Sequence, residues 1–286
     1  MIQITRFLLI VCFFIVVAQC ANPEWNSNAA YQSLYLSCDA FCDPAGYLGT
    51  HNYNGLLQGF NATMTIHEKK YDTYGFVGYL PSDTSIYVAY RGSEGWQNWM
   101  ADLETTKVTY PYCSGCEVHK GFYEALMGDF DNVEKEVRRL KSLFPSYAVK
   151  TTGHSLGAAL AQLASTELVS RGITVKYAYT FGQPRTGNAA YSAYSSSKVP
   201  LTFRHVHYAD PVPHVPPPEF GFYHNCLEEW EPNEVYDASK SDALLQCGSY
   251  PENCEDTGDC MESIPDKDLN PDDHMTYLGV PIKCYA

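Results

Sequence analysis

Residues 150–164 read KTTGHSLGAALAQLA, and the pentapeptide Gly153-His154-Ser155-Leu156-Gly157 within them places a serine between two glycines. The pattern predicts an apolar strand before this serine and an alanine-rich helix after it. A G-x-S-x-G turn at such a junction forces the serine into a strained conformation and exposes its hydroxyl above the sheet. Glycine and serine are common, so the pentapeptide alone is a weak indication. The rest of the chain decides whether Ser155 is a nucleophile.

The segments around this turn alternate between strand-like and helix-like patterns. Runs rich in β-branched and aromatic residues predict strands, and apolar residues three or four apart predict amphipathic helices. The predicted strands cover 62–67, 74–80, 84–90, 147–152, 174–181 and 202–208, and the predicted helices cover 28–42, 121–144 and 155–171. Strands that alternate with long helices imply an α/β fold whose largely parallel sheet is covered on both faces.

The N-terminal residues have the pattern of a secretory signal peptide. Residues 1–20 contain Arg6, an unbroken apolar run from Phe7 to Ala18, and small residues around a break at Cys20. The run is shorter than the roughly 20 residues of a membrane anchor, and no later segment is long and uncharged enough to span a bilayer. We therefore expect a secreted, monomeric chain in which residues 21–286 form a single domain.

Charge excludes one class of partner. The chain has 19 basic and 33 acidic residues, so removal of Arg6 with the signal peptide leaves 18 against 33, a net charge of about −15. Such a surface repels nucleic acid. Asn61-Ala62-Thr63 is the only usable glycosylation sequon, and it predicts a surface loop there.

Nine cysteines remain after signal removal, and an oxidising compartment favours disulfides. The spacing of Cys113 and Cys116 predicts a small loop-closing bridge, because no matching second pair supports a zinc or redox site. The odd total leaves one thiol without an internal partner. The other seven cysteines are Cys38, Cys42, Cys226, Cys247, Cys254, Cys260 and Cys284.

A serine hydroxyl becomes a good nucleophile only when a base takes its proton and an acid orients that base. Asp210 follows the strand 202–208, at the sheet edge expected for Ser155, and the alternative is that it only stiffens a loop before proline. His274 lies in the turn-forming NPDDHMTYLG near the C-terminus and is the best candidate base. The rival histidines are His205, His207, His214 and His224. His205 and His207 have a metal-compatible spacing, but no third ligand is evident, so we expect no metal.

Two further groups belong to the predicted site. The amide of Leu156, at a helix start, can hydrogen-bond a negative oxygen on the substrate, and the amide of Ser93 in YRGSEGWQNWMADL can supply a second donor. Trp96, Trp99 and Met100 share one face if this segment is helical. We interpret them as a lid that covers the site in water and opens at a lipid surface; the alternative is an ordinary core-packing helix.

Together these motifs resemble the fungal-type class 3 triacylglycerol lipases of the α/β-hydrolase superfamily, which are similar to fungal feruloyl esterases. The resemblance runs from about Tyr31 to Cys284 and rests on GHSLG, YRGS with NWMADL, CEVHKGFY, TFGQPRTGN and DPVPHVPP in family order. It implies Ser155 as nucleophile, Asp210 and His274 as its partners, an oxyanion hole at Ser93 and Leu156, no cofactor, and bridges Cys42–Cys284 and Cys113–Cys116. The cysteine-rich stretch 226–260 departs from the family, so its pairing and that of Cys38 stay open.

The expected activity is hydrolysis of a carboxylic ester through an acyl-enzyme. Exposed indoles in the expected lid favour a lipid substrate at a lipid–water interface. A feruloyl esterase or a phospholipase on the same fold is the nearest alternative. A lipid-binding protein without catalysis is a different class, and the presence of all three triad residues argues against it.

Overall fold

The structure is a computed structural model that describes residues 25–42, 47–51, 55–101, 103–225, 227–248 and 260–286, without the side chains of residues 99 and 101. The predicted signal peptide and the cysteines at 226 and 254 lie outside the described residues. Within those residues no helix has the length and apolar character that a membrane crossing requires.

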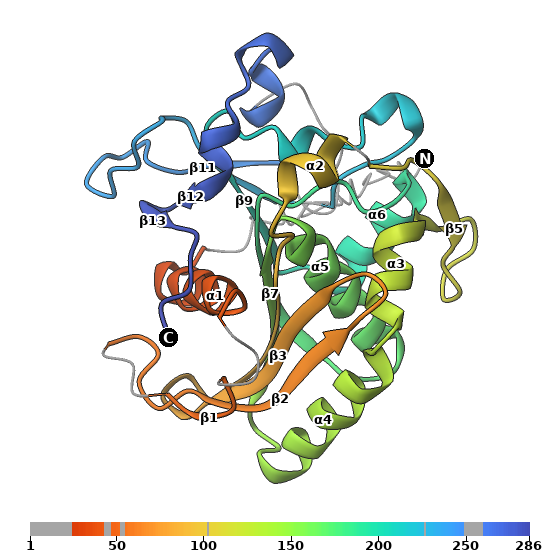
Figure 1. Cartoon of the computed structure of the whole chain (residues 1–286), viewed down its shortest axis with the longest axis vertical. Helices are drawn as coiled ribbons and strands as arrows, with labels where there is room; N and C mark the ends of the chain where they lie inside the picture. The colour runs from red at the N-terminus through yellow and green to blue at the C-terminus, as the bar shows by residue number, and fades with distance from the viewer. Residues whose placement is uncertain (1–24, 43–46, 52–54, 102, 226, 249–259) are drawn as a thin grey trace, which may run out of the picture.

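In the described part of the chain, one sheet of nine strands runs in the order β1-β2-β3-β4-β7-β8-β9-β10-β11 (Figure 1). The strands from β4 to β10 pair in parallel, while β1 to β3 and β11 add antiparallel edges. Their bounds are β1 Gly49–Thr50, β2 Asn61–Glu68, β3 Thr73–Leu80, β4 Ser85–Tyr90, β7 Ala148–His154, β8 Val175–Phe181, β9 Thr202–His207, β10 Glu228–Glu231 and β11 Leu245–Cys247. Two small hairpins pair β5 Lys107–Thr109 with β6 Glu117–His119 and β12 Thr276–Tyr277 with β13 Val280–Pro281.

Helices cover both faces of the sheet (Figure 1). Helix α1 packs on one face, and α3, α4, α5 and α6 pack on the other, while α2 lies at one end. The bounds are α1 Ser27–Asp39, α2 Trp96–Ala101, α3 Lys120–Met127, α4 Phe130–Leu143, α5 Leu156–Ser170 and α6 Ala189–Lys198, with 3-10 helices at Pro81–Asp83, Val212–His214, Pro218–Phe220, Cys260–Ser263, Asp266–Asp268 and Pro271–Met275. The predicted α/β fold with a mainly parallel sheet is confirmed.

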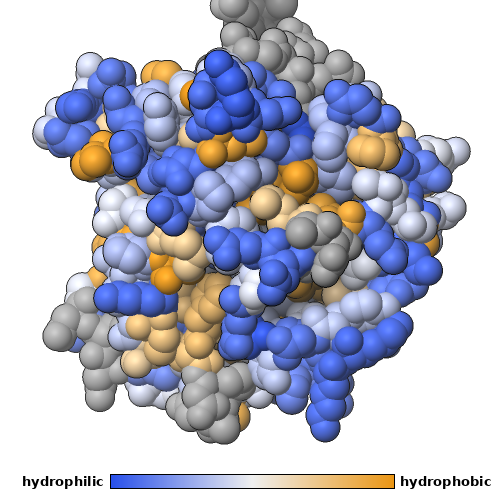
Figure 2. Space-filling view, turned by 45° about the horizontal axis from the view of Figure 1, so that its top comes forward, coloured by the Kyte–Doolittle hydropathy of each residue, from blue (hydrophilic) through white to orange (hydrophobic). Residues whose placement is uncertain are grey.

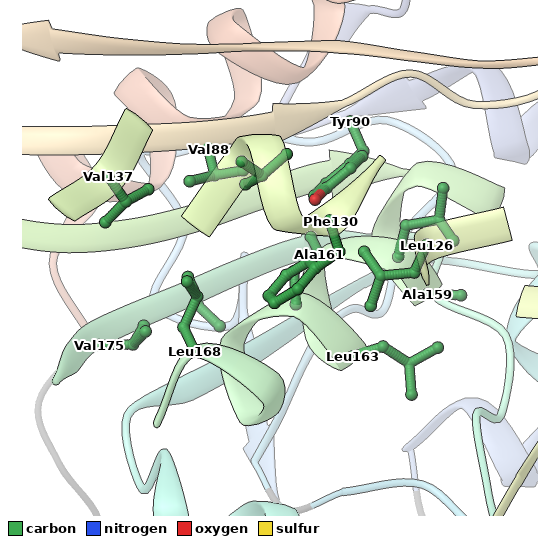
Figure 3. Close-up of a cluster of buried hydrophobic side chains, with 14 of the residues drawn as sticks. Val88, Tyr90, Leu126, Phe130, Val137, Ala159, Ala161, Leu163, Leu168 and Val175 are labelled. Atoms are coloured by element: carbon green, nitrogen blue, oxygen red, sulfur yellow. The ribbon is translucent and has the colours of Figure 1, made fainter. Parts of the chain in front are cut away.

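The largest core cluster lies between the sheet and the helices α3 to α5. Val88 on β4, Phe130 and Val137 on α4, and Leu163 and Leu168 on α5 are fully buried there (Figure 3). Burying a side chain of this size contributes roughly 1.5–3 kcal/mol. The small residues of α5 let this helix lie close to β4 and β7, and that packing fixes the position of its N-terminus.

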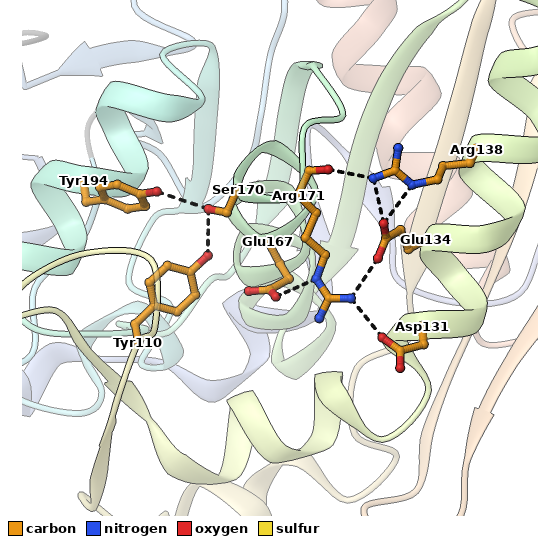
Figure 4. Close-up of polar contacts among 8 residues, drawn as sticks. All are labelled: Tyr110, Asp131, Glu134, Arg138, Glu167, Ser170, Arg171 and Tyr194. Atoms are coloured by element: carbon orange, nitrogen blue, oxygen red, sulfur yellow. Dashed lines mark hydrogen bonds and ion pairs between the residues drawn. The ribbon is translucent and has the colours of Figure 1, made fainter.

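An ion-pair cluster also joins α4 to α5 (Figure 4). Arg171, after the end of α5, bonds Glu134 at 2.7 Å, Asp131 at 2.9 Å and Glu167 at 2.9 Å. Burial opposes ionisation of Glu134, but its bonds to Arg171 and Arg138 outweigh that effect and lower its pKa. The charges therefore stay paired where the two helices meet.

The prediction of one helix over 121–144 is wrong, because the structure has two helices, α3 and α4. Helix α3 ends at Met127 with Gly128 as its C-cap, and the Asp129 carbonyl begins a new turn by accepting from the amides of Asn132 and Val133. The apolar spacing continues across this break, because both helices bury the same side, and so periodicity alone did not reveal it.

Strand β10 was not predicted, because its sequence EEWE has three acidic residues, yet all four residues are buried. Each glutamate has a specific partner. Glu228 pairs with Arg204 at 3.2 Å, Glu229 accepts from Gln246 at 2.6 Å, and Glu231 accepts from the Leu278 amide at 2.9 Å. Tertiary partners therefore override the low strand propensity of glutamate. Helix α6 and the hairpin β5–β6 were not predicted either.

Disulfides join Cys42 to Cys284, Cys113 to Cys116, and Cys247 to Cys260, while Cys38 is a buried free thiol. The expectation of a loop at the sequon is wrong. Asn61 begins strand β2, is half-buried, and donates its side-chain amide to the Thr50 hydroxyl at 2.6 Å. Its glycosylation stays a prediction.

Candidate active site

Ser155 lies at the junction between β7 and α5, at the carboxyl ends of the parallel strands. Its φ of 59° and ψ of −127° are a strained combination for a residue with a side chain, costing about 1–3 kcal/mol. The Ser155 amide donates to the Phe181 carbonyl on β8 at 2.9 Å, which holds the turn against the sheet. A Cβ atom at Gly157 would collide with the Tyr90 carbonyl, so a side chain there would push α5 away from β4.

Asp210 and His274 meet at the same end of the sheet. Asp210 follows β9, and its Oδ2 accepts from His274 Nδ1 at 2.8 Å, while its Oδ1 accepts from the Val212 amide at 2.8 Å. The Tyr277 hydroxyl donates to the same Oδ2. Burial alone would raise the pKa of this carboxyl, but His274, Tyr277 and the Val212 amide outweigh it and lower the pKa. Asp210 is therefore an ionised, fully buried acceptor for the imidazole.

Contacts through His154 and Gly182 place the His274 ring beside Ser155. His154 precedes Ser155, its Nε2 bonds the His274 carbonyl at 2.8 Å, and the two imidazole centroids are 4.3 Å apart. Gly182 follows Phe181, whose carbonyl accepts from the Ser155 amide. A Cβ atom at Gly182 would lie 2.8 Å from His274 Cε1. Ser155 Oγ and His274 Nε2 are both buried and have no hydrogen-bond partner among the described residues. The Ser155 hydroxyl and an imidazole nitrogen of His274 without a hydrogen-bond partner among the described residues therefore lie at the same end of the sheet.

The loop between β4 and α2 brings Ser93 close to Ser155. A Cβ on the preceding Gly92 would lie 3.1 Å from Ser155 Cβ, so the two segments are in close contact. Arg91 anchors the loop through Asp72 at 2.7 Å and Glu94 at 3.0 Å. Leu156 is the first residue of α5, where amides lack intrahelical partners. Ser93 and Leu156 line one cavity of about 560 Å³.

Helix α2 lies over the histidine. Trp96 is only 8% exposed, and its ring centroid lies 4.5 Å from that of His274. Met100 is half-buried, and the side chain of Trp99 lies outside the described part of the chain. Trp96 is therefore the predicted lid residue that contacts the candidate base.

Three of the four rival histidines, His205, His207 and His224, have side-chain hydrogen bonds to other elements. His207 bonds the carbonyls of Asp273 and Glu234, each at 3.0 Å, and His224 Nε2 bonds the Pro213 carbonyl at 2.8 Å. His205 contacts Trp25 Nε1 at 3.4 Å, and burial lowers its pKa to about 3. Burial also lowers the pKa of His214. Among the described residues no three potential ligands gather as a metal site requires.

Sequence reasoning missed three residues that surround the pair Asp210–His274. Tyr277 is fully buried, and a buried tyrosine hydroxyl normally needs a polar partner, here the Asp210 carboxylate. Gly182 has a φ of +60°, and its missing side chain leaves room for Tyr277, His274 and Asp210. His154 occupies the variable position of the G-x-S-x-G motif. The signal in the sequence was that Gly182 lies in the motif TFGQPRTGN and His154 in GHSLG.

The chain is similar in sequence to several known lipases. The family model described as lipase (class 3) matches residues 87–220. A lipase of Rhizomucor miehei is 39% identical over 218 residues, covering 73% of this chain and 56% of that protein. A secreted mono- and diacylglycerol lipase A of Penicillium cyclopium is 34% identical over 159 residues, covering 56% of this chain and 52% of that protein. The chain thus spans about half the length of these curated relatives.

Solved structures extend the match over most of the fold. The Rhizomucor miehei lipase in complex with its propeptide superposes with a TM-score of 0.79 at 32% identity, covering 89% of this chain and 81% of that one. A structure described as a triacylglycerol lipase with a serine protease triad at its catalytic centre superposes with a TM-score of 0.78 at 32% identity, covering 90% of this chain and 96% of that one.

Proposed function

Because the chain belongs to the class 3 lipase family, we propose that it is a secreted hydrolase of lipid esters that acts through Ser155, His274 and Asp210. The observation that carries the proposal is the strained Ser155 at the sheet edge where the buried pair Asp210–His274 is held. The names of the relatives support a lipid substrate and secretion. The monomeric state stays a prediction.

The proposed mechanism assigns one task to each group. His274 Nε2 takes the proton of Ser155 Oγ, and the oxygen attacks the ester carbonyl. Asp210 fixes the imidazole with its Nδ1 proton directed at the carboxylate, and it stabilises the positive charge that forms on the ring. The amides of Ser93 and Leu156 stabilise the oxyanion, and each such donor is worth about 10²–10³ in rate. His274 then protonates the departing alcohol, and water releases the acid.

Opening of α2 is part of this proposal. Trp96 covers the His274 ring, so the substrate carbonyl needs this helix to move. Figure 2 turns this end of the molecule toward the viewer, and apolar residues lie in the middle of the face among hydrophilic ones. A lipid surface would bind the apolar side of an opened α2 and offset the cost of exposing it.

The test compares Ser155→Ala with Ser170→Ala, which alters another serine near the end of the same helix, where it contacts Tyr110 and Tyr194 (Figure 4). We expect Ser155→Ala to lower hydrolysis of p-nitrophenyl butyrate on the order of 10⁶-fold and to abolish labelling by a fluorophosphonate. Ser170→Ala should retain both. Wild-type rates in Ser155→Ala would contradict the proposal. Emulsified triolein, phosphatidylcholine and methyl ferulate then separate lipase, phospholipase and feruloyl esterase activity.

A further inference from the structure

Arg185 is a buried cation beside the loop that follows Asp210. It lies in the segment TFGQPRTGN after β8, and its side chain is 1% exposed. A buried charge is tolerated when it is paired with an opposite charge and hydrogen-bonded. Arg185 meets both conditions, because Nη1 bonds backbone carbonyls and Nη2 bonds the Glu262 carboxylate. Neither Arg185 nor Glu262 has a task in the mechanism proposed above.

Arg185 holds three consecutive residues of this loop. Its Nη1 donates to the His214 carbonyl at 2.6 Å and to the Pro216 carbonyl at 3.3 Å. Its backbone amide donates to the Val215 carbonyl at 2.9 Å. A guanidinium can bond several acceptors at once because it is planar and presents its donors in a fixed arrangement. The end of the loop farther along the chain from Asp210 is therefore fixed to the segment after β8.

The other end of the loop carries the acid of the proposed triad. The Val212 amide donates to Asp210 Oδ1 at 2.8 Å, and the Val215 amide donates to the Val212 carbonyl at 3.2 Å. Asp210 Oδ2 is the atom that accepts from His274 Nδ1. A carboxylate is planar and rigid, so a bond that fixes Oδ1 also sets the direction of Oδ2. The position of Val212 therefore affects how the carboxylate meets the imidazole.

Glu262 connects the loop to the cysteine-rich stretch in which the chain departs from the family. It lies in the 3-10 helix Cys260–Ser263, and its side chain is 25% exposed. The disulfide between Cys260 and Cys247 ties this helix to β11 at the edge of the sheet. Glu262 therefore presents its carboxylate from an anchored position. Its bond to Arg185 joins two charged groups, and such bonds are stronger than those between neutral groups.

Building on the proposed function, we propose that Arg185 and Glu262 are positioning residues, whose ion pair holds the loop 211–216. The loop in turn holds Asp210 in line with His274. Without the Glu262 carboxylate, the guanidinium moves toward other acceptors and its bonds to the loop carbonyls weaken. Neither residue lines the cavity of the candidate site, so their loss should slow turnover and leave substrate binding unchanged.

The test compares Glu262→Ala and Glu262→Gln with the wild type on p-nitrophenyl butyrate. We expect Glu262→Ala to lower kcat by about tenfold to 100-fold and to change KM by less than about twofold, because small displacements of a catalytic group are costly. Glu262→Gln keeps a hydrogen-bond acceptor and loses the charge, so kcat should fall by about threefold. Proton NMR should show the downfield resonance of His274 Nδ1–H, which reports the bond to Asp210, shifted or broadened in the same order.

The matched control is Glu134→Ala, which removes another glutamate–arginine pair, the one that joins α4 to α5 (Figure 4). The Glu134 side chain is 17% exposed, similar to that of Glu262. Urea unfolding should show lower stability in both Glu134→Ala and Glu262→Ala. By contrast, kcat and the His274 proton resonance should change only in the Glu262 variants.

A kcat of Glu262→Ala within about twofold of the wild type would overturn the inference. A rise in KM with unchanged kcat would also overturn it, because Glu262 would then act in substrate binding. An equal loss of kcat in Glu134→Ala would mean that any loss of stability slows the enzyme, against the inference. If Glu262→Ala does not fold, an unchanged kcat in Glu262→Gln overturns it. All these outcomes leave the proposed function intact, whereas a wild type that neither hydrolyses the ester nor reacts with the fluorophosphonate would overturn that function.

Discussion

Burial of Glu231 predicts that the free energy of unfolding depends on pH. Its side chain is 1% exposed; Oε1 accepts from the Leu278 amide at 2.9 Å, and Oε2 has no partner among the described residues. Burial raises its pKa from 4.5 to about 8, although the Leu278 bond acts in the opposite direction. Leu278 follows Tyr277, whose hydroxyl bonds Asp210. The Glu231 carboxyl therefore holds the segment that carries Tyr277 behind the candidate site.

The sign follows from the protons bound in each state. Below pH 4.5 Glu231 is neutral in both the folded and the unfolded chain. Between pH 4.5 and about 8 the unfolded chain loses this proton while the folded chain keeps it, so the free energy of unfolding falls as pH rises. At about 1.4 kcal/mol per pH unit over about 3.5 units, the loss is on the order of 5 kcal/mol by pH 8.

The perturbation is Glu231→Gln, which keeps the acceptor for the Leu278 amide and removes the charge at every pH. We expect the free energy of unfolding to match that of the wild type near pH 4.5 and to exceed it by about 3–5 kcal/mol at pH 8. Urea unfolding followed by tryptophan fluorescence at several pH values measures this difference. The exposed Glu234→Gln, on the same segment, should show no such trend. The pKa of Glu229 is raised to about 7, but Glu229 is present in both proteins. Its contribution therefore cancels in the difference between their free energies of unfolding. A difference that does not change between pH 4.5 and 8 would refute the reasoning.

Two further predictions concern the candidate site. Gly182→Ala places a Cβ 2.9 Å from Asp210 Oδ2 and 2.8 Å from His274 Cε1, so we expect kcat/KM on p-nitrophenyl butyrate to fall about 100-fold. Gly172→Ala, at a φ of +84° with open space around it, should cost only backbone strain, and equal activity losses in the two variants would show that the crowding argument is wrong. Trp96→Ala removes the ring that covers His274, so activity on dissolved p-nitrophenyl butyrate should rise about threefold to tenfold, and the gain on adding an emulsion should shrink. A rate on the dissolved ester that falls instead, in a folded variant, would mean that the indole supports catalysis rather than covering the site.

The short-range features of this site were readable from the chain. The two glycines around Ser155 predict the turn, and the alternation of strands and helices predicts a parallel sheet, because both depend on neighbours within a few residues. The order of Ser155, Asp210 and His274 along the chain predicts a nucleophile, an acid and a base. Asp210 follows strand β9, which pairs with β8, and β8 pairs with β7. The regular geometry of parallel strands therefore brings Asp210 to the sheet edge where Ser155 lies.

Other properties were decided only by packing between segments distant in the chain. The sequence determined that Ser155 stands at a strand–helix turn and that an acid and a histidine follow it. The tertiary structure decided that Tyr277 shares the Asp210 oxygen with His274, that Trp96 rests on the imidazole, and that the glutamates of β10 are buried with partners from other elements. Local propensity acts over a few residues, whereas hydrogen bonds and burial depend on which surfaces meet after the chain has folded. That dependence on distant neighbours is the physical reason why the sequence indicated the candidate groups, while their surroundings required the three-dimensional structure.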